Sequence, residues 1–227
     1  MKSKTCISFS ELLLGKLTLI IFFAFFLIPA LVSAQNAEYW IALAEKYCIY
    51  ENQYTVNVTT EVFLIPEDTT TNHAMNKVLA NGKSIEKSSA LLKYTKEDGL
   101  RNTLHQENTE DMSTSSKRSS FILDVGYMLK KMKGKARWVL EDDHKFLGKQ
   151  DCVVISSSGE NWLVRLWINR KDGKVLCYDQ YLNNKYIGRS MIKYGQPLDG
   201  KYFPTEATTH FHLTGHIIKL TYNEYSF

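Results

Sequence analysis

Cysteine and proline are both scarce in this chain, with four of each among 227 residues, and glycine reaches only twelve. This composition excludes collagen-like and low-complexity sequence, which need abundant glycine and proline. Three cysteines follow residue 34, namely Cys48, Cys152 and Cys177. Three is too few for a disulfide-rich scaffold. We interpret them as buried small side chains, although one disulfide could form in an oxidising compartment.

A strong excess of one charge is also missing. The chain holds 28 basic and 24 acidic side chains, and the excess of +4 falls to +2 once the first 34 residues are set aside. Nucleic-acid-binding domains normally carry a strongly basic patch or stripe. The charge balance therefore argues against nucleic acid as a partner.

Familiar catalytic and cofactor motifs are absent from the sequence. The run Ser156–Gly159 lacks the glycine spacing of a nucleophile elbow, and there is no phosphate-binding glycine loop or dinucleotide fingerprint. Cys152 and Cys177 lack the spacing of metal-ligand pairs. We therefore expect no cofactor and no enzymatic activity, with a hydrolase of envelope substrates as the weaker alternative.

Three histidines form the densest group of potential metal ligands, namely His210, His212 and His216. His210 and His212 share one face of a predicted strand. The predicted turn places His216 on the opposite face, so that three ligands do not converge. The acidic run Glu141–His144 stands where a strand should end and is interpreted as a solvated loop. The sequence therefore predicts no metal site.

The first 34 residues have the pattern of a secretory signal. Lys2, Lys4 and Lys16 precede an apolar run over 17–32, and a small-residue cleavage pattern ends at Ala34. We predict cleavage after Ala34, which leaves residues 35–227 as a single exported domain. An uncleaved membrane anchor is the alternative, but the run is short for a membrane span.

A helix and a strand are predicted at the start of the exported part. Residues 36–50 have helical spacing, and residues 54–65 alternate between apolar and polar side chains as a half-buried strand does. The predicted core-facing stripe of the helix consists of Tyr39, Leu43, Tyr47 and Tyr50. Residues 66–120 show few patterns, and the polar stretch 109–120 is predicted to be a mobile loop.

A second helix is predicted from Phe121, capped by Ser119 or Ser120 and ended by Gly134. Apolar residues follow helical spacing through it. Five cations gather at its C-terminal end, where they complement the helix dipole. They are Lys130, Lys131, Lys133, Lys135 and Arg137. A docking surface for an acidic partner is the alternative interpretation of these cations.

From residue 136 onward the pattern is that of an antiparallel meander. In residues 161–169, alternate positions form one continuous apolar face, which consists of Trp162, Val164, Leu166 and Ile168. A three-residue loop over 171–173 would pair Ile168 with Leu176, Leu166 with Tyr178 and Trp162 with Leu182. The same register places Arg165 opposite Asp179 on the outer face, where an exposed ion pair contributes about 0 to 1 kcal/mol.

The last hairpin is predicted from residues 207–222. A two-residue turn at Thr214 and Gly215 would pair Phe211 with Ile218 and Thr209 with Leu220. One face of this hairpin is then mostly apolar and the other is polar. Both hairpins belong to sheets that are covered on one side and wet on the other.

The C-terminal half resembles the LolA-like outer-membrane lipoprotein-sorting proteins, which form a superfamily with LolB and RseB domains. The resemblance covers roughly residues 121–227. Three segments carry it: Phe146–Ile155, Leu166–Leu176, in which Asn169 replaces the usual aspartate, and Asp199–Thr205. It implies an α+β fold, in which helices cover the concave face of a strongly curved antiparallel sheet that forms an incomplete barrel.

The resemblance also implies a function. It points to a periplasmic, non-enzymatic carrier that binds lipid or lipoprotein acyl chains in an apolar cavity, works as a monomer and meets an inner- or outer-membrane protein. The expected cavity residues are Trp162, Val164, Leu166, Ile168, Leu176, Tyr178, Phe211, Ile218, Leu220, Val125, Met128 and Met132. A closed core without a cavity, and an RseB-like envelope-stress regulator, are the alternatives.

Overall fold

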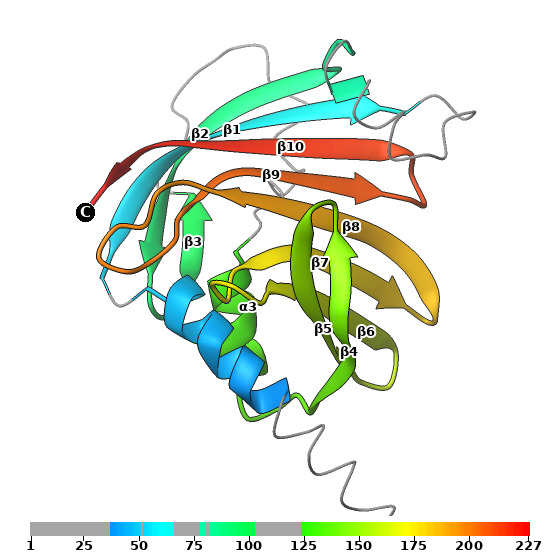
Figure 1. Cartoon of the computed structure of the whole chain (residues 1–227). Coiled ribbons are helices and arrows are strands. Elements are labelled where there is room, and N and C mark those ends of the chain that lie inside the picture. The colour runs from blue at the N-terminus through cyan, green and yellow to red at the C-terminus, as the bar shows by residue number, and fades with distance from the viewer. Residues whose placement is uncertain (1–36, 51, 66–77, 80–81, 103–123) are drawn as a thin grey trace, which may run out of the picture.

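A computed structural model describes residues 37–50, 52–65, 78–79, 82–102 and 124–227. The predicted signal over 1–34 and the predicted loop over 109–120 lie outside these residues. The described part contains one open sheet and two helices (Figure 1).

Ten antiparallel strands form the sheet in the order β3-β2-β1-β10-β9-β8-β7-β6-β5-β4. Strands that are consecutive in the chain pair with each other, except β3 and β4, which are the two edge strands. β1 also pairs with β10, so that the first strand joins the last. The strands are β1 (Tyr54–Leu64), β2 (Glu86–Thr95), β3 (Gly99–Asn102), β4 (Trp138–Leu147), β5 (Gln150–Ser158), β6 (Trp162–Asn169), β7 (Val175–Leu182), β8 (Lys185–Tyr194), β9 (Pro204–Phe211) and β10 (His216–Ser226).

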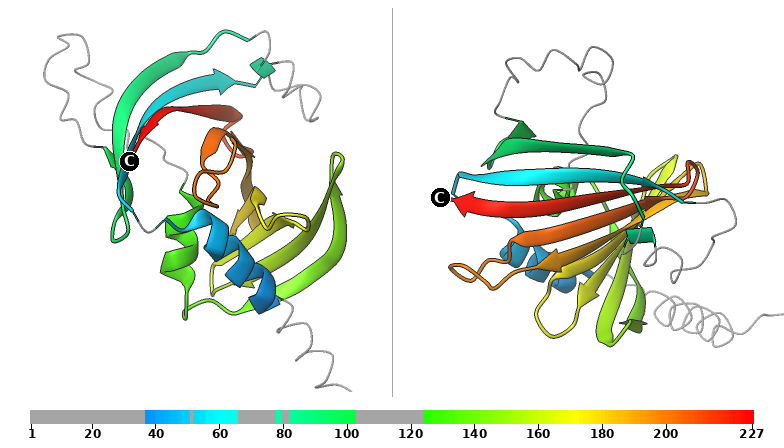
Figure 2. Two further views of the ribbon diagram at one scale, coloured as in Figure 1. Left: turned by 60° about the vertical axis from the view of Figure 1, so that its left-hand side comes forward. Right: turned by 90° about the horizontal axis from the view of Figure 1, so that it is seen from above.

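Both helices lie on the concave side of the sheet, as Figures 1 and 2 show. The N-terminal helix covers residues 37–48, and α3 covers Val125–Met132. Apolar side chains of both helices and of the inner strand faces form the main core cluster. The strongly curved, unclosed sheet with helices over its concave face confirms the fold class expected from the sequence.

The N-terminal helix turns a different stripe toward the sheet than the one predicted. Its buried residues are Ala37, Ile41, Ala44 and Cys48, whereas Tyr39 is 60% exposed. Small side chains let the helix approach the concave sheet closely. Of the predicted stripe, Tyr50 is buried in the core, Leu43 and Tyr47 are half-buried and Tyr39 is exposed, so that the predicted stripe is wrong for the helix itself.

The second helix begins four residues later than predicted. Asp124 is its N-cap, and its side chain accepts a hydrogen bond from the Tyr127 amide at 2.9 Å. Gly134, at a φ of +70°, follows its C-terminal end as expected. A Cβ added to Gly126 would lie 2.1 Å from the Cys48 carbonyl oxygen, so that this glycine allows the two helices to touch.

The β6–β7 hairpin keeps most of the predicted register. Arg165 lies opposite Asp179, and Leu166 lies opposite Tyr178. The loop is one residue longer than predicted, because Asn169 pairs with Lys174 by a backbone hydrogen bond of 2.8 Å. Ile168 therefore lies opposite Val175, and a β-bulge restores the predicted register farther from the turn.

Two further predictions need correction. The β9–β10 turn is longer than two residues, since Phe211 pairs with His216 and Thr209 pairs with Ile218. This shift by two leaves each side chain on its predicted face. The acidic run over 141–144 lies within β4, where the pairing with β5 is irregular at Asp142.

Candidate functional site

An open pocket of about 370 Å³ lies where the C-terminal end of α3 faces β6, β7 and the start of β8. Strand alternation and one helix side chain build its wall. Its lining residues are Met132, Trp162, Leu163, Val164, Tyr178, Gln180, Tyr181, Leu182 and Ile187. None of these side chains carries a charge.

Four of the twelve predicted cavity residues line this pocket. They are Met132, Trp162, Val164 and Tyr178. Burial raises the pKa of Tyr178 to about 12, because the ionised phenolate would lose its hydration there. The predicted apolar face of β6 therefore contributes its N-terminal end to the pocket.

Most of the remaining predicted residues belong to the closed core. Leu166, Ile168, Leu220 and Val125 are buried, and Met128 and Ile218 pack partly buried against the same core. Phe211 is half-buried at the end of β9. These residues support the fold next to the pocket.

Leu176 lies on the other side of the sheet from its predicted position. It packs with Cys152, Val154, Trp167 and Cys177 in a second cluster. The bulge next to Ile168 is the reason, because the extra residue on β7 turns Leu176 to the face that the helices do not cover. The three described cysteines are buried and unpaired, as expected.

The sequence did not predict the other five pocket residues, which are Leu163, Gln180, Tyr181, Leu182 and Ile187. The sequence could have indicated Leu182, because the predicted register already placed it opposite Trp162. Gln180 continues the alternation from Tyr178 but is polar and was not counted. Ile187 reaches the pocket at a register irregularity between β7 and β8, which no sequence pattern indicates.

Two apolar side chains stand at the mouth of the pocket. Trp162 is 39% exposed and Leu182 is 50% exposed, and they face each other across β6 and β7. The Trp162 ring lies over Gly159, where an added Cβ would be 2.3 Å from the indole Nε1. Gly159 therefore makes room for an aromatic ring at the rim.

Hydrogen bonds hold α3, the helical wall of the pocket, at both ends. At its start, the Asp124 carboxylate also accepts from the Leu100 amide of β3 at 2.9 Å. At its end, the Lys133 ammonium donates to Glu45 of the N-terminal helix at 2.8 Å. Burial raises the pKa of Asp124, whereas the hydrogen bond to Glu45 raises the pKa of Lys133.

The concave space under β1, β2 and β10 is filled with stacked aromatic rings. Tyr54 and Tyr94 stack with centroids 4.8 Å apart, and Tyr50 stacks on Phe203 at 4.4 Å. The cavity beside them measures only about 20 Å³, close to the space of one water molecule. The concave side of the sheet is thus filled under β1, β2 and β10, whereas the pocket under β6–β8 is open.

The outer face of β6–β8 contains a buried charge. Asp179 is 2% exposed and accepts two hydrogen bonds from Arg189, at 2.6 and 2.8 Å, and one from Trp167 at 3.0 Å. Arg165 instead pairs with Glu141 at 2.6 Å. The predicted register, with Arg165 opposite Asp179, is thus confirmed, but the predicted exposed ion pair between them is wrong.

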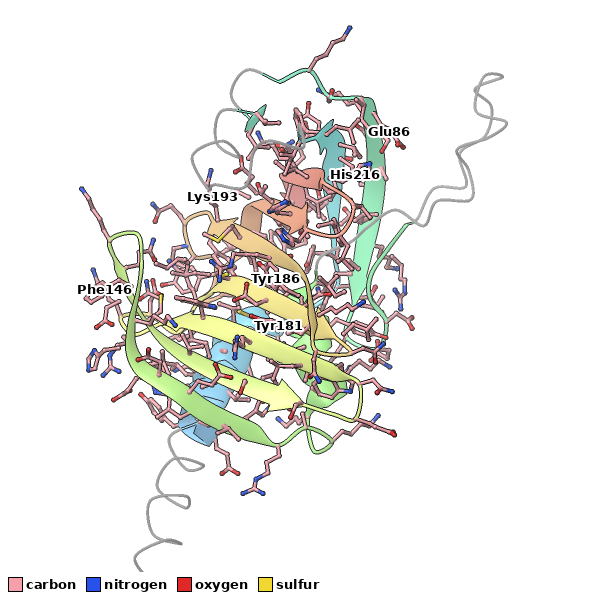
Figure 3. All side chains as sticks on the ribbon, turned by 90° about the vertical axis from the view of Figure 1, so that its right-hand side faces the viewer. Glu86, Phe146, Tyr181, Tyr186, Lys193 and His216 are labelled. Carbon is pink, nitrogen blue, oxygen red and sulfur yellow. The ribbon has the colours of Figure 1, made fainter. Side chains whose placement is uncertain are left out.

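Figure 3 shows this outer face. Tyr181 and Tyr186 lie side by side there on β7 and β8, with ring centroids 5.2 Å apart. Tyr181 also accepts a hydrogen bond from Arg165 at 2.8 Å. Tyr181 therefore links β6, β7 and β8 on the outer face.

Metal ligands do not gather anywhere in the residues that the structure describes, since no group of three His, Cys, Asp or Glu side chains could hold an ion. Over the same residues, the helices are too short or too polar to cross a membrane.

Neither a protein-family profile nor a curated protein sequence matches the chain. Similar folds occur among solved structures. A LolA superfamily protein from Nitrosomonas europaea superposes with a TM-score of 0.53 at 13% identity, over 84% of this chain and 92% of that one. A DUF1329 family protein from Desulfovibrio piger gives a TM-score of 0.51 at 10% identity over the same shares. The chain therefore has the fold of the LolA superfamily proteins.

Proposed function

We propose that this protein is a non-enzymatic carrier that holds lipid or lipoprotein acyl chains in the pocket between α3 and β6–β8. The uncharged pocket of about 370 Å³ is the observation that carries the proposal. Small-molecule sites in proteins are mostly apolar and measure about 300–1,000 Å³. The likeness in fold to a LolA superfamily protein supports the same assignment.

The lining fits acyl chains better than a reacting substrate. Burial of an acyl chain contributes about 0.8 kcal/mol for each methylene group removed from water. Catalysis would need titratable groups that converge on one point, and the inner face of β7 offers the neutral Tyr178 and Gln180 side chains instead. The flexible Met132 side chain suits a wall that adapts to chains of different shape.

Further parts of the proposal concern the setting of the protein. Residues 35–227 form one domain, which is exported to the periplasm after removal of the signal over 1–34. There the protein acts as a monomer and exchanges its ligand with an inner- or outer-membrane protein. The signal-like sequence before Gln35 supports export.

A titration with a fluorescent fatty acid tests the carrier function. Leu182→Glu places a charge at the lining of the pocket, and we expect it to weaken binding at least tenfold because a carboxylate near the chain must be desolvated. Leu198→Glu is the matched control, since Leu198 is similarly exposed at 44% but lies outside the pocket lining.

The control variant should bind like the wild type, and both variants should keep the wild-type thermal unfolding. Absence of fatty-acid binding by the wild type, or equal binding by the two variants, would contradict the proposal.

A further inference from the structure

A cationic edge follows α3 on the way to β4. Between Val125 and Leu140 the chain has five basic side chains and no acidic one. Three of the five make contacts: Lys130 donates to the Lys96 carbonyl, Lys131 lies over the Tyr127 ring at 5.0 Å, and Lys133 pairs with Glu45. Lys135 and Arg137 are exposed, and neither has a side-chain partner within the described residues.

These two free cations lie beside the mouth of the pocket. The amide of Lys135 donates to the carbonyl of Met132, whose side chain lines the pocket. Arg137 directly precedes Trp138, which pairs with Ser157, and Ser157 pairs with the pocket residue Val164. Backbone pairing therefore places the segment with Arg137 at the same end of the sheet as the first residues of β6, two strands away across β5.

The same rim carries exposed apolar side chains. Trp162 and Leu182 stand at the mouth, and Lys185, which pairs with Leu182, adds a further cation. Glu160 in the β5–β6 turn is the acidic residue of this rim. Exposed tryptophan and leucine bordered by lysine and arginine are typical of surfaces that rest in the interface of a bilayer.

We propose that this rim is a docking surface for a membrane that presents anionic lipid headgroups. Lys135 and Arg137 meet the headgroups, while Trp162 and Leu182 enter the interface and bring the mouth of the pocket to the lipid. Charge complementarity distinguishes this occupant from a neutral bilayer. The proposal extends the carrier function, because a carrier must meet the source of its ligand.

Vesicle co-sedimentation of the full mature chain at low salt tests the proposal. We expect the wild type to bind vesicles of phosphatidylcholine with phosphatidylglycerol, and to bind pure phosphatidylcholine vesicles weakly. Lys135→Gln combined with Arg137→Gln should reduce binding to the anionic vesicles about twenty-five-fold, since each cation near such a surface contributes about a fivefold factor. Lys149→Gln with Lys171→Gln is the control, because these exposed lysines lie in the turns at the other ends of β5 and β6.

The control should bind within twofold of the wild type, and vesicle-free fatty-acid binding should be unchanged in both variants. Equal vesicle binding by the two variants, or no preference for anionic vesicles, would overturn the proposal. Loss of fatty-acid binding in the Lys135 and Arg137 variant would also overturn it, because the cations would then hold the ligand itself. A wild type that binds anionic vesicles but no fatty acid would refute the carrier function and leave the docking surface intact.

Discussion

At the residue scale, Asp179 shows where a correct register still gave a wrong interaction. The pairing of β6 with β7 predicted Arg165 as its partner, and Arg165 does lie opposite. Its ionic partner comes from β8 instead, because Arg189 lies opposite Asp179 on its other side. β7 has a neighbouring strand on each side, and the hairpin predicted from the sequence identified only β6.

Removal of the Asp179 carboxylate should be costly for this reason. We expect Asp179→Ala to lower the free energy of unfolding by about 3 kcal/mol, because the half-buried Arg189 would lose its compensating charge. Glu141→Ala, which breaks the more exposed pair with Arg165, should cost about 0 to 1 kcal/mol. Urea unfolding of both variants measures the difference, and equal costs would show that Asp179 is solvated.

A second prediction at this scale concerns Asp124, whose pKa is raised above its ordinary value by burial. Such a carboxyl stabilises the fold most at a pH below the unfolded pKa, and this contribution is lost as the pH rises through the folded pKa. Asp124→Asn removes the titration and keeps a side-chain oxygen for the helix cap. The difference in the free energy of unfolding, variant minus wild type, should therefore increase from about pH 4 to pH 7.

Urea titrations at several pH values measure this slope. If the difference between Asp124→Asn and the wild type stays constant or falls as the pH rises, the pKa of Asp124 is not raised. Asp124→Ala provides the comparison for the lost cap: it should show the same rise with pH, and should be about 0.5 to 2 kcal/mol less stable than Asp124→Asn at every pH.

At the element scale, alternation predicted the strands well and loop lengths poorly. Residues 54–64 form β1 and residues 162–169 form β6, because period-two apolar patterns report directly which face is buried. The two hairpin loops are longer than predicted by one and two residues. A loop can lengthen by one when a bulge absorbs the extra residue, and the side-chain pattern does not show this.

Contact between the two helices gives a prediction at this scale. Gly126→Ala should destabilise the fold by about 3 kcal/mol, because the new Cβ would clash with the Cys48 carbonyl and force the helices apart. Gly134→Ala, just after the same helix, should cost about 1 kcal/mol from its left-handed backbone alone, since nothing lies within 4 Å of the added Cβ. Thermal and urea unfolding check both, and equal costs would rule out a tight helix contact.

At the scale of the whole molecule, the sequence and the resemblance predicted the curved sheet and its covered face, and the structure confirms them. The location of the open space could not be predicted. Aromatic side chains from β1, β2 and the β8–β9 connection fill one part of the concavity, and these contacts join residues distant in sequence. Leu166, which was predicted to line the cavity, is fully buried, while Trp162 at the start of the same strand is exposed at the mouth.

Native mass spectrometry of the full chain, purified from its own cell envelope without detergent exchange, tests the carrier account most directly. The account predicts a complex whose excess mass is that of a lipid or an acylated peptide, and predicts that Leu182→Glu, but not Leu198→Glu, is recovered without it. Wild-type protein recovered only in the ligand-free form, under conditions that preserve a known lipid carrier with its ligand, would contradict the account.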